Sequence, residues 1–155
     1  MTRDIKNEKM NVSALKNGTV IDHIPPRNLF KVIALLDLDQ CTSQMTFGTN
    51  LNSKLLGKKA IIKIADLFLE EKDIDKIAMI APTAKLNIIK DYQVVEKRAL
   101  CIPDVVKGIV KCLNPKCITN NEEVPTVFEV VERHPLTLRC HYCEKTVGQE
   151  DIVLR

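Results

Sequence analysis

Four cysteines near the C-terminal end of the chain form the clearest chemical pattern in the sequence. Cys112 and Cys117 are separated by four residues, Cys140 and Cys143 by two, and twenty-two residues lie between the pairs. Two such knuckles, each holding two thiolates at a tight turn, can close a tetrahedron around Zn²⁺ at about 2.3 Å per sulfur. Four cysteines leave no open position for water or substrate, so the spacing predicts a structural rather than a catalytic zinc.

Other interpretations of the cysteines explain less of the pattern. Four buried thiols without metal would leave the paired spacing without a reason, and a redox pair at Cys140 and Cys143 would leave the other pair unexplained. His141 lies inside a knuckle and could replace a thiolate, but four cysteines already complete the shell, so we expect it to be an exposed loop residue. Cys41 and Cys101 are isolated in sequence, and we expect them to pack as ordinary small hydrophobic residues.

Cysteine usage and the polar beginning of the chain indicate a cytoplasmic protein. Residues 1–10 are mostly polar and charged and lack the apolar middle of a secretory signal. No run of eighteen or more apolar residues is present, so no membrane span is expected. In a protein without an export signal, six cysteines favour metal or free thiols over disulfides.

The distribution of charge argues against nucleic-acid binding. Residues 1–103 hold sixteen Lys and Arg against twelve Asp and Glu, and residues 104–155 hold seven against eight. The cysteine-rich part is therefore acidic by one charge before any metal binds, whereas phosphate neutralisation supplies most nucleic-acid affinity. The alternatives are a zinc-ribbon nucleic-acid-binding or docking protein and a small metalloenzyme. The charge disfavours nucleic-acid binding, and the complete thiolate shell, with no enzymatic motif elsewhere, disfavours the enzyme.

Hydrophobic periodicity predicts an α+β region over residues 1–103 and a small all-β region over residues 104–155. Strands are expected at 19–24, 45–52, 60–65, 86–89 and 92–95, and helices at 29–36 and 71–81. The order β-α-β-β-α-β with one extra strand is the split βαβ pattern of ferredoxin-like sheets, in which helices cover one face and leave the other face or an edge free for a partner.

The C-terminal region is expected to be zinc-ribbon-like. Apolar residues at 127–131 and 136–138 are enough for a hairpin packed under the metal. About fifty residues bury little surface alone, so we expect this region to depend on zinc for its folding.

Several cations lie in or beside the predicted strands of the first region. Lys59 and Lys63 border or lie in one apolar strand, and Lys97 and Arg98 end another. Any one of them could simply face solvent, but two or three meeting across a sheet could hold a phosphate chain. His23 alternates with Ile24 on a strand, where a histidine is more often structural.

The sequence resembles the regulatory chains of aspartate carbamoyltransferase over about residues 12–154. The run GTVIDHIP at 18–25 resembles the opening strand of that family, and the cysteine pairs with their flanking residues resemble its zinc knuckles. Similar stretches are 62–64, 81–82, 87–97, 112–118 and 138–145. The arm at residues 1–17 departs most from the family pattern.

The resemblance implies a non-catalytic regulatory subunit with a nucleotide-binding allosteric domain and a zinc domain. In that family the zinc domain docks on a separate catalytic chain, which joins carbamoyl phosphate to aspartate in pyrimidine biosynthesis. Regulatory chains pair as a homodimer through their N-terminal domains, and CTP and ATP compete for one site as inhibitor and activator. The expected partners are therefore the catalytic chain, a second regulatory chain and the two nucleotides, with no nucleic acid and no membrane.

The resemblance also implies a set of nucleotide-binding residues. Lysines would meet the ribose and triphosphate, and a histidine would assist near the phosphates. An aspartate would accept a hydrogen bond from a hydroxyl or amino group. Aliphatic side chains would line the base, and backbone groups near Leu15 and Tyr92 would read its edge. In this sequence the set is Val12, Leu15, Val20, Asp22, His23, Lys63, Asn87, Ile89, Tyr92, Val94 and Lys97.

Overall fold

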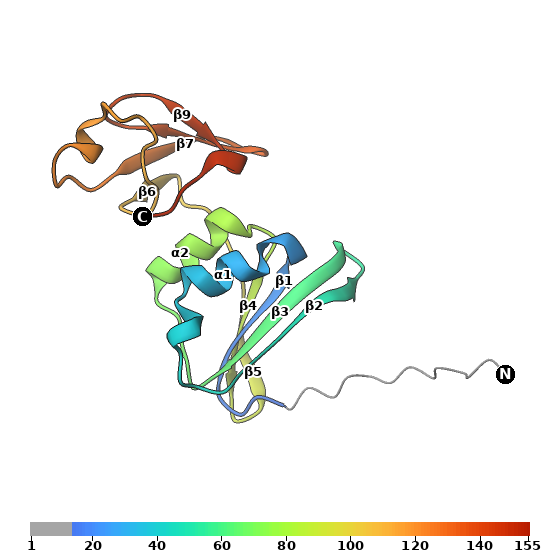
Figure 1. The fold of residues 1–155 in the computed structure, drawn as a ribbon. Coiled ribbons are helices and arrows are strands. Elements are labelled where there is room, and N and C mark those ends of the chain that lie inside the picture. Colours follow the sequence, from blue (N-terminus) through green and yellow to red (C-terminus); the bar gives the residue numbers. More distant parts are fainter. Residues whose placement is uncertain (1–13) are drawn as a thin grey trace.

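The computed structural model describes residues 14–155 as an α+β domain followed by a small all-β domain (Figure 1). Two helices lie side by side across one face of the first sheet, and its other face carries no helix (Figure 1). The predicted Val12 lies outside the described residues. The elements of the first domain are β1 (Gly18–Ile24), α1 (Leu29–Leu35), β2 (Met45–Ser53), β3 (Gly57–Ala65), α2 (Glu71–Ile80), β4 (Lys85–Lys90) and β5 (Gln93–Ala99).

The strand order of the first sheet is β2-β3-β1-β4-β5, and every neighbouring pair is antiparallel. The connection from β1 through α1 to β2 passes over β3, and that from β3 through α2 to β4 passes over β1. Each connection therefore joins two strands that are separated in the sheet by one strand of the other connection. This interleaving is the split βαβ arrangement, so the ferredoxin-like prediction is confirmed, with β5 as the extra strand at the edge.

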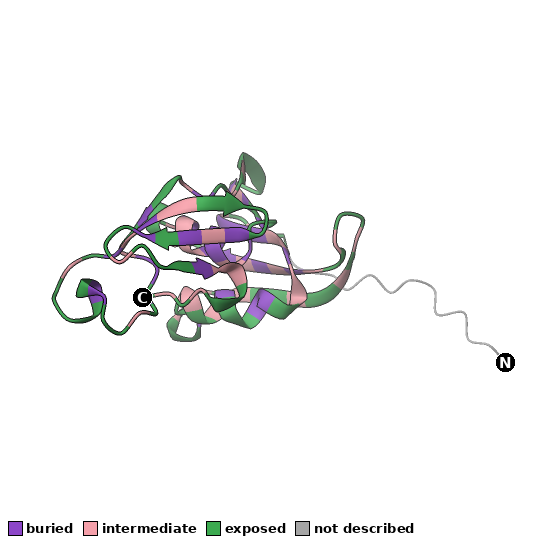
Figure 2. Cartoon of the chain, turned by 90° about the horizontal axis from the view of Figure 1, so that it is seen from above, coloured by how far each residue is buried: buried purple, intermediate pink, exposed green. Residues whose placement is uncertain are grey.

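Alternation along the strands places one set of side chains under the helices. Ile21, Ile62 and Ile64 are fully buried there against Ile74 and Ile77 of α2. Figure 2 shows buried residues following half-buried and exposed ones along the strands and helices of the fold. The strand side chains between the buried ones lie on the helix-free face, because successive residues of a strand point to opposite faces.

The C-terminal domain is a four-stranded antiparallel meander. Its strands, in the order β6-β7-β8-β9, are β6 (Val105–Lys107), β7 (Val127–Arg133), β8 (Leu136–Cys140) and β9 (Thr146–Gly148). The predicted hairpin is β7 with β8. A second core gathers Phe128, Leu136 and Leu138 with the cysteines, and it also takes in Ala78 and Met79 from α2. The two domains therefore share an apolar contact at the end of α2.

The structure corrects several strand boundaries: β3 begins at Gly57 instead of residue 60, and β5 spans Gln93–Ala99 instead of residues 92–95. The prediction placed Tyr92 in a strand at 92–95, but Asp91 and Tyr92 form the turn between β4 and β5, with φ of 49° and 65°. Positive φ at both central residues is typical of tight hairpin turns, whose twist matches that of the flanking strands. No helix in the described part of the chain is long and apolar enough to cross a membrane.

Candidate metal centre and cationic sheet face

The four knuckle cysteines converge on one point in the C-terminal domain. Their sulfur atoms all lie within 4.8 Å of one another, with 3.6 Å between Cys112 and Cys143 and 3.8 Å between Cys117 and Cys140. A tetrahedron with arms of about 2.3 Å has edges of about 3.8 Å, so the arrangement fits Zn²⁺. The sulfurs are too far apart for disulfides, whose S–S bond is about 2.05 Å.

Backbone turns and two asparagines hold the knuckles in shape. The Cys117 amide donates to the carbonyl of Asn114 at 3.0 Å, which closes the first turn around Pro115. The side-chain amide of Asn120 donates to the carbonyls of Cys112 and Asn114 at 2.8 and 2.7 Å. Asn121 donates in the same way to those of Pro115 and Cys117, at 3.0 and 2.8 Å. Sequence reasoning missed these two asparagines, since polar loop residues are common and only the fold shows what they bond.

Environment divides the four thiols into two classes. Burial raises the pKa of Cys112 to about 12 and also raises that of Cys140. Burial acts in the same direction on Cys143 and Cys117, but hydrogen bonds to their thiolates outweigh it, and the pKa of Cys143 falls to about 7. The Thr119 hydroxyl supplies one such bond to Cys117 at 3.2 Å. Because a metal binds thiolates, bound Zn²⁺ must displace protons here, and its affinity falls as the pH falls.

His141 does not join the sulfurs. Its backbone amide donates to the Val127 carbonyl at 2.8 Å, and its ring is more than half exposed beside Glu129, at 3.5 Å. The structure therefore places it as the exposed loop residue that the sequence predicts.

The helix-free face of the N-terminal sheet carries a straight row of predicted site residues. Strand register places Lys63 of β3 opposite Val20 of β1, Val20 opposite Asn87 of β4, and Asn87 opposite Lys97 of β5. Directly opposed residues in antiparallel strands share a face. Four predicted residues from four strands thus stand side by side, and the row continues to Thr46 of β2 on the far side of Lys63.

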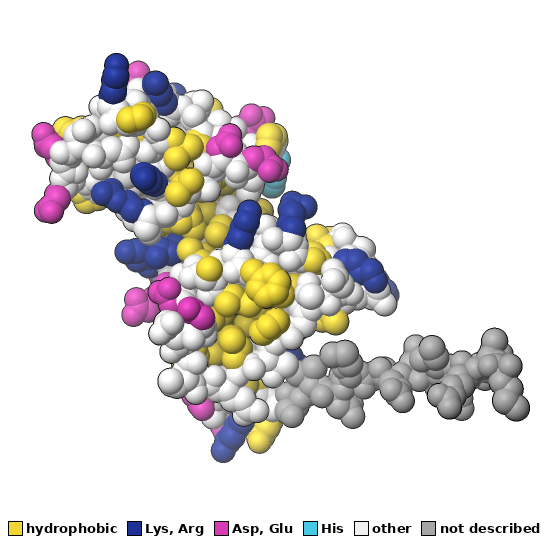
Figure 3. Space-filling view, viewed as in Figure 1, with side chains coloured by type: hydrophobic (Ala, Val, Ile, Leu, Met, Phe, Trp, Pro, Cys, Tyr) yellow, Lys and Arg dark blue, Asp and Glu magenta, His cyan; other side chains and the backbone are white. Residues whose placement is uncertain are grey.

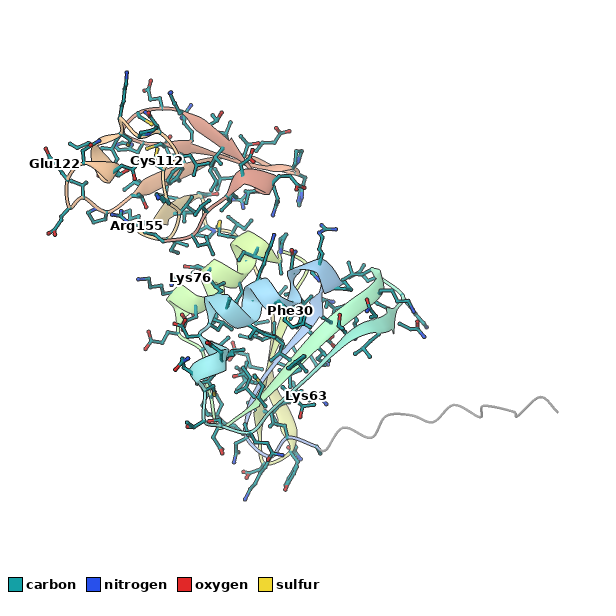
Figure 4. The ribbon with its side chains drawn as sticks, in the orientation of Figure 1. Phe30, Lys63, Lys76, Cys112, Glu122 and Arg155 are labelled. Atoms are coloured by element: carbon teal, nitrogen blue, oxygen red, sulfur yellow. The ribbon has the colours of Figure 1, made fainter. Side chains whose placement is uncertain are left out.

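A cavity of about 300 Å³ opens at the Gly18 end of this face. Predicted residues Leu15, Lys63 and Tyr92 line it. Its other walls come from the segment before β1, the start of β2 and the end of β3: Ala14, Lys16, Asn17, Gln44, Thr46, Ala65 and Asp66. Figure 4 labels Lys63 near this end of the sheet. Predicted Ile89 and Val94, which are paired with each other, lie at the same end, since Ile89 stands opposite Gly18.

Gly18 fixes the path of the segment that walls the cavity. Its φ is +145°, and a Cβ there would lie 2.0 Å from the carbonyl oxygen of Ile64. Only glycine tolerates both conditions. The segment is then tied down by backbone bonds from Asp66 to the Asn17 carbonyl at 2.9 Å and from Tyr92 to the Lys16 carbonyl at 3.0 Å.

The opposite end of the face carries paired charges. β1 has an irregularity between Ile21 and Ile24, where Asp22 and His23 lie. Asp22 accepts from the Lys59 ammonium at 2.9 Å and from the His23 backbone amide at 2.7 Å. The His23 ring nitrogen Nδ1 makes no hydrogen bond within the described residues and lies 3.5 Å from Asp22.

Of the predicted nucleotide set, the structure gathers the described members along this face and at its two ends, in three groups. The groups are the cavity end, the cross-strand row and the charged end. The nucleotide set implied by the resemblance left out Lys59, which the sequence analysis named only as a strand cation, and Lys85. Both add cations to this face: Lys59 binds Asp22, and Lys85 stands opposite Asp22. Two-residue alternation from Lys63 to Ile61 to Lys59 is the signal that places Lys59 on the same face as Lys63.

Two family models match this chain and between them cover most of it. One, described as aspartate carbamoyltransferase regulatory chain, allosteric domain, matches residues 10–101. The other, described as aspartate carbamoyltransferase regulatory chain, metal binding domain, matches residues 104–153.

Full-length relatives agree with the family models. The aspartate carbamoyltransferase regulatory chain of Bacteroides fragilis is 54% identical over 147 residues, which is 95% of this chain and 96% of the relative. That of Porphyromonas gingivalis is 51% identical over 150 residues, 97% and 99% of the two chains. That of Pyrococcus abyssi is 50% identical over 147 residues, 94% and 97% of the two chains.

Proposed function

Because the chain belongs to the family of aspartate carbamoyltransferase regulatory chains, we propose that it binds CTP and ATP and passes their effect to a catalytic chain. The nucleotide site is the helix-free face of the N-terminal sheet, within residues 1–103. Residues 104–155 form the zinc domain that docks on the catalytic chain. The protein works in the cytoplasm, in keeping with its free thiols.

The cross-strand row is the observation that carries the nucleotide site. Lys63 and Lys97 flank Val20 and Asn87 across four strands, so two cations and an amide face one line of the sheet. The Lys63 ammonium makes no hydrogen bond or ion pair to another residue of the described range 14–155, and its charge is therefore free to meet an anion. A flat sheet face with spaced ammonium groups suits a ligand that carries several negative charges.

The two ends of the face assign the orientation of the nucleotide. Leu15, Ile89 and Val94 give the cavity end aliphatic side chains, which suit the flat faces of a base. Lys59, with His23 beside it, makes the other end cationic, which suits the terminal phosphates. Asp22 holds Lys59 at 2.9 Å and so keeps that ammonium pointing at the site. A triphosphate competes with Asp22 for Lys59, and His23 adds attraction when it is protonated.

Regulation follows from unequal binding to two quaternary states. A nucleotide shifts activity only by its difference in affinity between those states, typically by about 1–3 kcal/mol. The experiment that tests the function is reconstitution of this chain with its catalytic chain. Carbamoylaspartate formation should respond to CTP and ATP in the assembly and should be insensitive to both with the catalytic chain alone. Equal activity with and without nucleotide in the assembly would reject the proposal.

The docking surface is proposed to surround the zinc knuckles. Leu113, Ile118 and Tyr142 are 49%, 41% and 43% exposed, and each directly adjoins a knuckle cysteine in the sequence. Exposed apolar and aromatic side chains gathered on one small surface are typical of a protein interface. Since the knuckle turns position all three, docking depends on the metal.

Truncation of that surface should weaken assembly. We expect Tyr142→Ala to reduce affinity for the catalytic chain by about 30-fold, the usual effect of losing a central aromatic anchor. Surface plasmon resonance on the immobilised catalytic chain measures this. Val131→Ala, which shortens a side chain that is 53% exposed on β7, is the matched control and should bind normally. Equal affinity of the Tyr142→Ala variant and the control would place the interface elsewhere.

A second copy of the chain is proposed to pair along β2. This strand is an edge of the sheet, and beside it Phe30 of α1 and Phe47 of β2 are 68% and 47% exposed, with ring centroids 6.3 Å apart. Figure 3 shows hydrophobic side chains gathered on this side of the domain, and Figure 4 labels Phe30 there. An open edge next to an apolar patch favours strand pairing with another chain.

A charge in this patch should block pairing. We expect Phe47→Glu to convert the dimer to a monomer in light scattering coupled to size exclusion, because pairing would bury the carboxylate. Phe68→Glu, at an equally exposed phenylalanine (48%) beside Lys90, should remain dimeric. A dimeric Phe47→Glu variant would show that the chains pair through another surface.

A further inference from the structure

Three polar side chains in the cavity wall lack partners within residues 14–155. Gln44, Thr46 and Lys63 all line the cavity of about 300 Å³, and Thr46 stands directly opposite Lys63. The Gln44 carbonyl accepts from the Ala65 amide at 2.8 Å, which continues the β2–β3 ladder and fixes the backbone there. None of the three side chains hydrogen-bonds to another residue in the described part of the chain.

Several polar groups of the other walls are already engaged. The carbonyls of Lys16 and Asn17 accept from the amides of Tyr92 and Asp66, at 3.0 and 2.9 Å, and the Asn17 side-chain oxygen accepts from the amide of Asp91 at 3.1 Å. A ligand in the cavity therefore finds three unengaged side chains together on the β2–β3 side, in addition to those of Lys16 and Asp66.

The three side chains differ in how well they can distinguish one nucleotide base from another. An ammonium acts as a point charge and a hydroxyl adapts to donor or acceptor, whereas a carboxamide is planar and presents two N–H donors beside one acceptor. Glutamine pairs with the polar edge of a base in that way, and a good pair discriminates against a base with the wrong donors and acceptors. Exposed at the mouth of the cavity, Gln44 is the planar amide on this wall.

We propose that Gln44 is a base-contacting residue that sets which nucleotides the site accepts. The inference rests on the proposed nucleotide function and extends it to base selectivity. By turning its amide over, Gln44 can accept from an exocyclic amino group, as in cytosine and adenine, or donate to a carbonyl, as in uracil. The wild-type side chain therefore tolerates both kinds of base.

The Gln44→Glu variant tests this, because a carboxylate keeps the shape but only accepts hydrogen bonds. CTP and UTP carry the same ribose and triphosphate, so their affinity ratio cancels the general repulsion from the added charge. Calorimetric titration of each nucleotide into the full zinc-loaded chain should show the ratio moving toward CTP by about fivefold or more.

The control is Gln40→Glu, which adds the same charge four residues earlier at an exposed position outside the cavity. It should keep the wild-type ratio. An unchanged ratio in Gln44→Glu, with a wild-type chain that binds both nucleotides, would overturn the role of Gln44 and leave the proposed function standing. A wild-type chain that binds neither nucleotide would instead refute the function itself, and the inference with it.

Discussion

The Cys117→Ser variant should lose the folded state of residues 104–155 while the N-terminal sheet stays folded. Cys117 is 2% exposed, its sulfur lies 3.8 Å from that of Cys140, and the Thr119 hydroxyl donates to it. A serine hydroxyl replaces a thiolate poorly as a zinc ligand. Structural zinc in small domains contributes on the order of 10 kcal/mol at pH 7, more than this small core can replace.

Zinc content, circular dichroism and limited proteolysis together measure the effect. Cleavage should be confined to the C-terminal domain, with some loosening at the end of α2, because Ala78 and Met79 pack into the second core. Cys101→Ser is the matched control, since Cys101 is exposed and lies outside the cluster, and it should retain full zinc and protease resistance. Full zinc content and an intact C-terminal domain in Cys117→Ser would contradict the metal centre.

The Lys63→Ala variant should bind CTP and ATP about tenfold more weakly or worse and should remain folded. Lys63 is the one cation that belongs both to the cross-strand row and to the cavity wall, and it is half-buried beside Val20. A hydrogen bond to a charged group contributes about 1.5–3 kcal/mol, and in this position it is shielded from competing water. Loss of the charge should also lower the dependence of nucleotide affinity on salt.

Lys58→Ala provides the comparison, because Lys58 lies on the same strand but binds Asn52 at 2.8 Å and does not line the cavity. Its nucleotide affinity should match that of the wild type. Calorimetry on both variants at two salt concentrations separates a specific contact from a general change in net charge. Equal losses of nucleotide affinity in Lys58→Ala and Lys63→Ala would indicate only a general effect of net charge.

The metal centre was predictable from sequence because its constraint is local. Each knuckle is a short turn, and four thiolates within two such turns need little more than a hairpin to bring them together. The order of the first sheet was predictable for a similar reason, since alternating strand and helix periods restrict the connections to a few arrangements. What the spacing could not show was the support by Asn120 and Asn121, which depends on how the intervening loop returns over the knuckle.

The helix-free face, proposed to bind the nucleotides, could be predicted as a set of residues, but the arrangement of those residues in space could not. Family resemblance supplied most of its members, yet neither Lys59 nor Gln44 was among them. Strand register decides which side chains meet, and here it is shifted at three irregularities, between Ile21 and Ile24, between Gly48 and Leu51, and between Ile88 and Ile89. A single sequence does not mark such bulges, because each adds one residue without changing the local composition.

The most direct test of the regulatory role is a calorimetric competition between CTP and ATP on the purified, zinc-loaded chain. Each nucleotide should bind alone, and saturation with one should abolish or sharply reduce the heat of the other, because both are proposed to occupy the same helix-free face. Independent binding of the two would contradict the shared site, and no binding of either would contradict the nucleotide-regulated function.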